Sequence, residues 1–323
     1  MTIAIIGAGI AGLSAAKHLL THGKSVRIFE KSRGVGGRMA TRYAGAWEFD
    51  HGAQYFTVQD DAFNAEIEAA QAAGVIAPWQ ARGLYLDKTG ISEDRGRPRF
   101  VGIPRMNSLP KFLASALDIE LNRRVANLSK GTNWDIHFED GTIETGFEAV
   151  ISTVPAAQAK AILPKTSALL DQIDDMQMQA CFSLMIGLNH PFDLSWDTLR
   201  VKDLPIDWIS NNGAKPGRNK RIGALLITSE ASWSDRHKDA DRDWVKRTML
   251  DAASAITDTT LYDAPHQDLH RWLYASNRYD TDLEFMSDDG IIVCGDWCKG
   301  GRVQGLGYLA ARRPLSCCKM ALL

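Results

Sequence analysis

The chain opens with a strand–turn–helix–strand pattern over residues 2–31, TIAIIGAGIAGLSAAKHLLTHGKSVRIFEK. Residues 3–6 are a short apolar run, which is typical of a buried parallel strand. Apolar residues then recur at helical spacing over residues 13–20, and Gly23 is placed to end that helix. Residues 26–29 are a second apolar run. The pattern predicts one βαβ unit of a parallel sheet.

The turn of this unit carries Gly7, Gly9 and Gly12 in the sequence GAGIAG. The first glycine permits a tight turn, the second lets the backbone approach a pyrophosphate, and the third lets the helix pack closely on the strand. A phosphate would lie at the helix N-terminus, at Ile10 and Ala11, where free N–H groups and the helix dipole favour anions. The motif predicts a dinucleotide site, and the alternative is a glycine-rich turn without a ligand.

An acidic residue, Glu30, closes the second strand. Its carboxylate can accept hydrogen bonds from both hydroxyls of a ribose. The same charge would repel a 2′-phosphate, so NADP is disfavoured at this site.

The loop after Glu30 favours FAD over NAD as the ligand. It runs from Lys31 to Met39 as KSRGVGGRM and contains Gly37 and Arg38. A simple NAD domain has no reason to carry a second loop of glycine and arginine here, whereas a longer ligand with a flavin end does. Arg38 can neutralise phosphate charge, and its alternative role is a surface salt bridge.

A third motif lies near the other end of the sequence. Residues 290–296, GIIVCGD, read as a last buried strand that ends at Asp296, whose carboxylate can hold a ribitol hydroxyl. Residues 300–305 then open a helix that includes Arg302 and Val303. The N-terminus of that helix can face the flavin pyrimidine ring, where it would raise the electron affinity of the ring.

The middle of the chain shows further elements. Helices are predicted at residues 60–74, 109–117 and 240–256, and strands at residues 119–153, 180–189 and 222–228, while residues 75–105 read as irregular. Because the first and last buried strands need one parallel sheet, the middle must form a second domain. We expect an α/β fold with a Rossmann-like, mostly parallel FAD-binding domain of discontinuous segments, plus a smaller α+β substrate domain with an antiparallel sheet. The expected boundaries are 1–59, 104–157 and 286–323 for the FAD-binding domain, and 60–103 and 158–285 for the substrate domain.

Composition limits the function classes. Of 323 residues, 45% are hydrophobic and 24% charged, which is typical of a globular protein. The net charge of -2 gives no global attraction to nucleic acid or to an anionic membrane. An odd count of five cysteines argues against a disulfide framework, and no signal peptide or bilayer-length apolar run is apparent, so a cytoplasmic protein is expected.

Several further residues are candidates for the site. In DHGAQYF, Gln54 and Tyr55 would lie against the flavin or pack in an ordered loop, and a covalent flavin link through His51 is disfavoured. In HRWLYA, Trp272 and Tyr274 alternate and would share one sheet face. With His270 they are candidates for the wall of a substrate cavity, and the alternative is a pair of core aromatics.

Two other patterns carry weaker signals. The four-residue spacing of His266 and His270 resembles a metal motif, but HQDLH lacks the glutamate of HExxH, and no metal is expected. Four arginines could hold substrate phosphates or lie in a solvated loop; they are Arg95, Arg97, Arg99 and Arg105.

The paired GAGIAG and GVGGR motifs resemble the amine-oxidase-like flavoprotein superfamily. Within it, KSRGVGGRMATR, FDHGAQYFT, GIPRMNSLPKFLA, HRWLYA and CGDWCKGGRVQG are similar to bacterial renalase-type proteins. The resemblance spans nearly the whole chain. It departs at Pro314, which would break the final helix, and in the tail that follows. It implies noncovalent FAD contacts at Ala11, Glu30, Arg38, Gln54, Tyr55, Val125 and Asp296.

The resemblance also implies an activity. Such proteins oxidise 2- or 6-dihydro isomers of NAD(P)H to NAD(P)⁺ and pass electrons to O₂, giving H₂O₂. Two alternatives stay open: a flavin-containing amine oxidase or desaturase-like enzyme, and a flavin-binding redox sensor without turnover. The expected partners are therefore a small-molecule substrate, either a dihydro-NAD(P) isomer or an amine, and O₂. No nucleic acid or membrane partner is expected.

Overall fold

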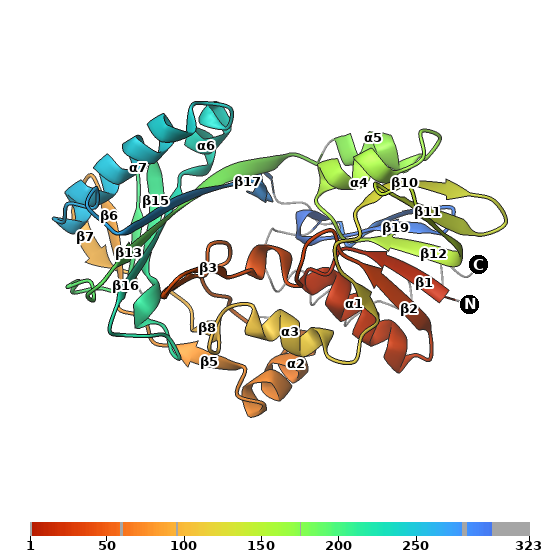
Figure 1. The fold of residues 1–323 in the computed structure, drawn as a ribbon, viewed down its shortest axis with the longest axis horizontal. Coiled ribbons are helices and arrows are strands. Elements are labelled where there is room, and N and C mark those ends of the chain that lie inside the picture. Colours follow the sequence, from red (N-terminus) through yellow and green to blue (C-terminus); the bar gives the residue numbers. More distant parts are fainter. Residues whose placement is uncertain (1, 59–60, 95, 175, 280–282, 299–323) are drawn as a thin grey trace.

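A computed structural model of the chain describes residues 2–58, 61–94, 96–174, 176–279 and 283–298. Within these residues the strands form an eight-stranded sheet, a seven-stranded sheet and two two-stranded sheets. The two large sheets lie at opposite ends of the molecule, each with its own helices (Figure 1). No helix among these residues is both long and apolar enough to cross a bilayer.

The first sheet joins the beginning and the end of the sequence, as predicted. Its order is β10-β11-β12-β1-β2-β9, with β19 beside β12 and β18 beside β19. Strands β2, β1, β12 and β19 are parallel neighbours, whereas β10, β11 and β12, in the region where strands were predicted, form an antiparallel meander. The strands are β1 (Thr2–Ile6), β2 (Ser25–Phe29), β9 (Ile119–Glu120), β10 (Val125–Lys130), β11 (Trp134–Phe138), β12 (Ile143–Ser152), β18 (Met286–Asp288) and β19 (Ile291–Val293).

Both faces of this sheet are buried, which explains the unbroken apolar run of β1. Ile3 and Ile5 pack on one face with helices α1 (Ile10–Thr21) and α3 (Ser108–Ala114). Ala4 and Ile6 pack on the other face with helices α4 (Ala156–Ile162) and α5 (Leu169–Asp174). Helix α1 ends where predicted, with Gly23 in a left-handed conformation at φ +73°.

The second sheet has the order β17-β13-β16-β15-β14-β6-β7 and is antiparallel except between β14 and β6. Helices α6 (Ala231–His237) and α7 (Arg242–Thr257) lie along its outer face (Figure 1). Helix α7 lies in the predicted range 240–256 and is capped by Asp241, which accepts a hydrogen bond from the Trp244 N–H at 2.8 Å. The strands are β6 (Gly83–Asp87), β7 (Gly90–Glu93), β13 (Met178–Leu188), β14 (Thr198–Val201), β15 (Ile206–Asn211), β16 (Gly223–Ser229) and β17 (His266–Asn277).

The prediction that residues 75–105 are irregular is wrong. They contain β5 (Ile76–Trp79) and β8 (Arg99–Gly102), which pair with each other, besides β6 and β7. Strand β6 pairs with β14, which is more than a hundred residues away in the sequence. The hydrophobic pattern of β6 itself does not predict this pairing.

These four strands also divide residues 60–103 between the two ends of the molecule. Helix α2 (Asp61–Ala72), β5 and β8 pack in the core of the first sheet, through side chains such as Ile67, Trp79 and Val101. Strands β6 and β7 belong to the second sheet. The prediction that assigned this whole segment to the substrate domain therefore differs from the observed packing. The wider division into an FAD-binding and a substrate domain stays a prediction.

A buried ionic cluster, Asp50 with Lys215 and Arg218, joins the two ends (hereafter the Asp50 cluster). Asp50 Oδ2 accepts hydrogen bonds from Lys215 Nζ at 3.1 Å and Arg218 Nη2 at 2.6 Å. Its Oδ1 accepts from Thr41 Oγ1 at 2.8 Å and from the Met106 N–H at 3.0 Å. The three charged side chains are at most 3% exposed. Burial alone would raise the pKa of Asp50, but the two cations hold it well below its ordinary value.

We expect Asp50→Asn to lower the free energy of unfolding by about 3–5 kcal/mol, because it leaves two buried cations without their carboxylate. Urea unfolding at pH 7 measures this loss. The matched control is Asp174→Asn, which removes an exposed partner of Lys160 and should cost at most about 1 kcal/mol. Equal stability of the two variants would contradict the importance of the Asp50 cluster.

Candidate active site

A cavity of about 1420 Å³ lies where the two ends of the molecule meet. Typical small-molecule pockets occupy about 300–1,000 Å³, so this cavity has room for a dinucleotide and a further ligand. Its wall comes from the first turn of α1, the loops after β2 and β12, and strands β10, β13, β14, β16 and β17. The wall includes the predicted site residues Gly7, Gly9, Ile10, Ala11, Glu30, Lys31, Gly37, Arg38, Met39, Tyr55, Val125, His270, Trp272, Tyr274 and Asp296.

The three glycines of the first turn have different surroundings. Gly7 adopts φ +103°, and a Cβ there would lie 2.9 Å from Thr153 Oγ1. A Cβ on Gly12 would lie 2.0 Å from the Gly7 carbonyl oxygen, so only glycine fits this contact between helix and strand. Around Gly9 there is no atom within 4 Å of an added Cβ, because this glycine faces the cavity. Gly12 therefore serves packing, and Gly9 leaves space for a ligand.

The first turn of α1 faces the cavity at Ile10 and Ala11. The N-cap residue, Gly9, offers no side-chain acceptor, and this turn contains no acidic side chain. The N–H groups of the turn are thus available to an anion, as the sequence predicts for a pyrophosphate.

Glu30 lines the cavity beside this turn and is only 6% exposed. Its Oε2 accepts from the Ala8 N–H and its Oε1 from the Ser32 N–H, each at 2.8 Å. These backbone bonds fix the carboxylate, and each oxygen retains capacity for a ribose hydroxyl. At the same end, Lys31 Nζ donates to Gln158 Oε1 at 2.7 Å, and Val125 forms part of the wall.

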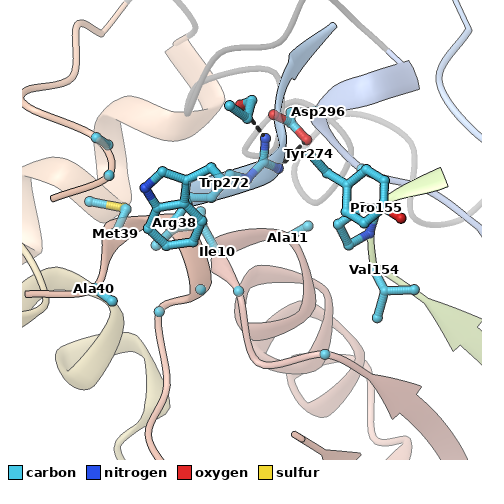
Figure 2. A pocket seen from close by; sticks show the side chains of 18 of the residues that line it. Ile10, Ala11, Arg38, Met39, Ala40, Val154, Pro155, Trp272, Tyr274 and Asp296 are labelled. Atoms are coloured by element: carbon cyan, nitrogen blue, oxygen red, sulfur yellow. Dashed lines mark hydrogen bonds and ion pairs between the residues drawn. The ribbon is translucent and has the colours of Figure 1, made fainter. Parts of the chain in front are cut away.

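Arg38 and Asp296 form an ion pair in the cavity wall. Arg38 Nη2 donates to Asp296 Oδ1 at 2.5 Å, and Nη1 donates to the Ala275 carbonyl at 3.0 Å (Figure 2). The alternative of a surface salt bridge for Arg38 does not fit, because the Asp296 side chain is only 6% exposed. The pair places a cation and an acceptor together, and their individual roles toward a cofactor stay predictions.

Gln54 does not line the cavity, unlike its neighbour Tyr55. Its amide donates to the carbonyls of Asp50 and Gly52, and its Oε1 lies 3.4 Å from Lys215 Nζ. The buried ammonium needs acceptors, and Gln54 supplies one. In the structure Gln54 bonds to the Asp50 cluster, and its expected contact with flavin stays a prediction.

Strand β17 brings His270, Trp272 and Tyr274 to the cavity. The intervening Arg271 and Leu273 line the cavity as well, so the alternation does not by itself select the residues of the wall. In Figure 2, Trp272 and Tyr274 project over the start of α1, where Ile10 and Ala11 lie. Trp272 Nε1 donates to the His51 carbonyl at 2.9 Å, which fixes its ring. His266 lies outside the cavity wall and stacks on Trp47 and Phe49. The described residues contain no group of three or more side chains arranged to hold a metal ion.

Sequence reasoning missed one part of the wall, formed by Cys181, Ser183, Arg200 and Thr228. Cys181 and Ser183 alternate on β13, and Ser183 is paired with Thr228 of β16. Their alternation predicts that Cys181 and Ser183 share one face of the sheet. Only the pairing of β13 with its neighbouring strands shows that this face lines the cavity.

The remaining candidates divide as follows. Arg97 and Arg99 line the cavity, whereas Arg105 lies outside its wall and pairs with Glu48. Cys181 and Cys294 are free thiols. Arg95, Arg302, Val303 and the tail after Pro314 lie outside the described residues.

The Glu30 geometry yields a test of the dinucleotide site. We expect Glu30→Gln to raise the Kd for FAD roughly 10- to 100-fold, because one amide end would oppose a backbone N–H and a charged acceptor for the ribose is lost. Fluorescence titration of FAD-free protein measures this Kd. Glu144→Gln is the control, since Glu144 pairs with Arg27 outside the cavity wall. An unchanged Kd in Glu30→Gln would refute the ribose assignment.

Comparison with known proteins agrees with this geometry. Residues 5–66 match the NAD(P)-binding Rossmann-like domain, and residues 71–313 match the flavin containing amine oxidoreductase family. Among curated proteins, 4,4'-diapophytoene desaturases of Staphylococcus haemolyticus and Staphylococcus aureus (strain Newman) are 45% and 43% identical over 60 and 68 residues. These segments cover 19% and 20% of this chain, but only 12% and 14% of the relatives.

Solved structures share the fold over most of the chain. A candidate protoporphyrinogen oxidase from Exiguobacterium sp. 255-15 has a TM-score of 0.79 at 12% identity, covering 99% of this chain and 98% of its own. Putrescine oxidase bound to putrescine has a TM-score of 0.73 at 14% identity, covering 99% of both chains. Reduced UDP-galactopyranose mutase has a TM-score of 0.70 at 12% identity, covering 85% of this chain and 83% of its own.

The cavity also fits the cofactor of this family. Gly9 leaves open space beside the N-terminus of α1, and Glu30 presents fixed acceptors one strand away. FAD is therefore the cofactor, as the sequence predicts. Since the family match covers more than half of its residues, the chain belongs to the flavin containing amine oxidoreductase family.

Proposed function

We propose that the chain is an FAD-dependent oxidase whose substrate is a 2- or 6-dihydro isomer of NAD(P)H. The products would be NAD(P)⁺ and, after reaction with O₂, H₂O₂. Bound FAD supplies a hydride acceptor, and formation of the aromatic pyridinium drives hydride release, so the protein needs to bind, orient and exclude water. The observation that carries the proposal is the positive charge on the cavity wall beside the second sheet.

Two exposed arginines on this part of the wall are available to a ligand. Arg97 and Arg200 both line the cavity, and neither has an ion-pair partner among the described residues. A guanidinium binds phosphate oxygens through a planar pair of donors. Two such groups suit the pyrophosphate of a dinucleotide substrate.

A stack of aromatic rings and guanidinium groups holds this wall in place. The Arg99 guanidinium lies 4.8 Å from the Tyr55 ring centroid and 5.4 Å from that of Trp208. Arg200 lies 5.2 Å from the same Trp208 ring. Arg99 also donates to Asp94 at 2.5 Å and to Thr198 at 2.9 Å. These contacts hold Arg99 rigidly and give Arg200 a flat surface on which to lie.

The acidic residues of the cavity favour an anionic substrate over an amine. Asp94 is paired with Arg99, Asp296 with Arg38, and Glu139 with Arg124. Glu30 is held by two backbone N–H groups at the other end. An ammonium substrate would meet cations rather than an unpaired carboxylate on this wall. The same charges oppose an apolar desaturase substrate.

The direct experiment is anaerobic mixing of the FAD-loaded protein with 2- or 6-dihydro-NAD(P). We expect rapid loss of the visible flavin absorbance, and recovery with release of H₂O₂ when O₂ is admitted. Reduction by putrescine or other amines alone would instead indicate an amine oxidase. Absence of reduction by either class, with FAD retained, would indicate a flavin-binding protein without turnover.

The charge argument has its own test. We expect Arg200→Gln to raise the KM for the dihydro-dinucleotide about tenfold, equivalent to about 1.4 kcal/mol, with kcat little changed, because a phosphate contact is present in both ground and transition states. Arg221→Gln is the control, since Arg221 is exposed and lies outside the cavity wall. Equal KM values in the two variants would overturn the phosphate assignment.

A further inference from the structure

His270 occupies a central place in the cavity wall. It lies in the middle of β17, paired with Ser183 of β13, and both side chains line the cavity. Its ring makes edge contacts with two other rings. The distance between ring centroids is 4.4 Å to Trp272 and 4.9 Å to His51. These contacts fix the plane of the imidazole.

The neighbour of one ring nitrogen determines where the imidazole carries its proton. Arg42 Nη2, from β3 (Arg42–Ala44), lies 3.2 Å from His270 Nδ1. A guanidinium has only donors, so Nδ1 must accept, and the proton of the neutral ring must sit on Nε2. An imidazolium would set two N–H groups against each other at this contact.

The electrostatic surroundings also keep this ring neutral. Burial lowers the pKa of His270, and Arg42 lowers it further. Asp268 acts in the opposite direction and Arg242 in the same direction as Arg42. The pKa of the adjacent His51 is itself lowered to about 4, mainly by burial, so His51 contributes no charge at neutral pH.

The other nitrogen, Nε2, takes no partner from the described residues. The imidazoles of His51 and His266 each contain a buried nitrogen without a hydrogen-bond partner, at Nδ1 and Nε2 respectively. His270 Nε2 is not among these buried atoms without a partner, and His270 is part of the cavity wall. A ligand in the cavity can therefore reach this N–H.

We propose that His270 presents a fixed Nε2–H donor to a carbonyl oxygen of the substrate, and that Arg42 is the residue that positions this proton. The role rests on the proposed function, in which the dihydropyridine ring carries a carboxamide. One hydrogen bond to that carboxamide would orient the ring against the cofactor.

A neutral donor suits this reaction better than a charged one. The dihydropyridine ring gains positive charge as it loses hydride. An imidazolium beside it would oppose that charge, whereas a neutral N–H binds the carbonyl with little repulsion. The Arg42 contact thus favours the protonation state that the proposed chemistry needs.

Nuclear magnetic resonance tests the donor without any substrate. In protein with ¹⁵N-labelled imidazoles at pH 7.5, the signals lost in His270→Asn identify His270. We expect the Nε2–H tautomer in the unaltered protein, a mixed or Nδ1–H population in Arg42→Met, and recovery of the Nε2–H form in Arg42→Lys. A predominant Nδ1–H tautomer or imidazolium in the unaltered protein would overturn the proposal.

Kinetics test what the donor binds. We expect His270→Leu to raise the KM for the dihydro-dinucleotide about tenfold, while His270→Gln, which retains an N–H donor, stays within about threefold of the unaltered protein. His190→Gln is the control, since His190 is exposed and outside the cavity wall. If His270→Leu matches this control, the contact with substrate is refuted. If no dihydro isomer reduces the unaltered protein, the proposed function and its carbonyl contact fail together, while the NMR result still decides the tautomer.

Discussion

The carboxylate of Asp50 links segments that are far apart in the sequence. It accepts two hydrogen bonds from cations of the loop after β15 and two from neighbours on the cofactor side, Thr41 and Met106. Buried ion pairs seldom stabilise a fold more than apolar packing would, because desolvation offsets the attraction. Their geometry, however, admits few alternatives. We interpret the Asp50 cluster as the device that sets the alignment of the two large sheets, and with it the shape of the cavity.

A few consecutive residues connect the Asp50 cluster to the cavity wall. Gln54 bonds the Lys215 ammonium, and the next residue, Tyr55, stacks near the Arg99 guanidinium in the cavity wall. A buried lysine that shares one carboxylate with an arginine needs this extra acceptor. Residues 50–55 thus connect a core electrostatic requirement to the position of a ligand-facing ring.

The parts of the fold that sequence could predict are those set by local physics. The glycine spacing, the apolar run of β1, the helix end at Gly23 and the Asp241 cap each depend on neighbours within a few residues. Within residues 75–105, the pairing of β6 with β14 depends on a distant segment, and so does the inward turn of Gln54 toward Lys215. The pairs β5–β8 and β6–β7 lie within the segment itself and were missed all the same. The same limit applied to Cys181 and Thr228, whose strands were predicted but whose cavity-facing side required the strand pairing.

The ion pair between Arg38 and Asp296 joins residues separated by 258 positions in the sequence. During synthesis on the ribosome, the glycine turn and Arg38 emerge first, but Asp296 on the other side of the cavity wall is made only when almost three hundred residues have been translated. A nascent chain therefore cannot complete the cavity wall until late. The first strand is covered earlier, because its sheet neighbours β2 and β12 and the helices α1, α3, α4 and α5 that pack on it all end by residue 174.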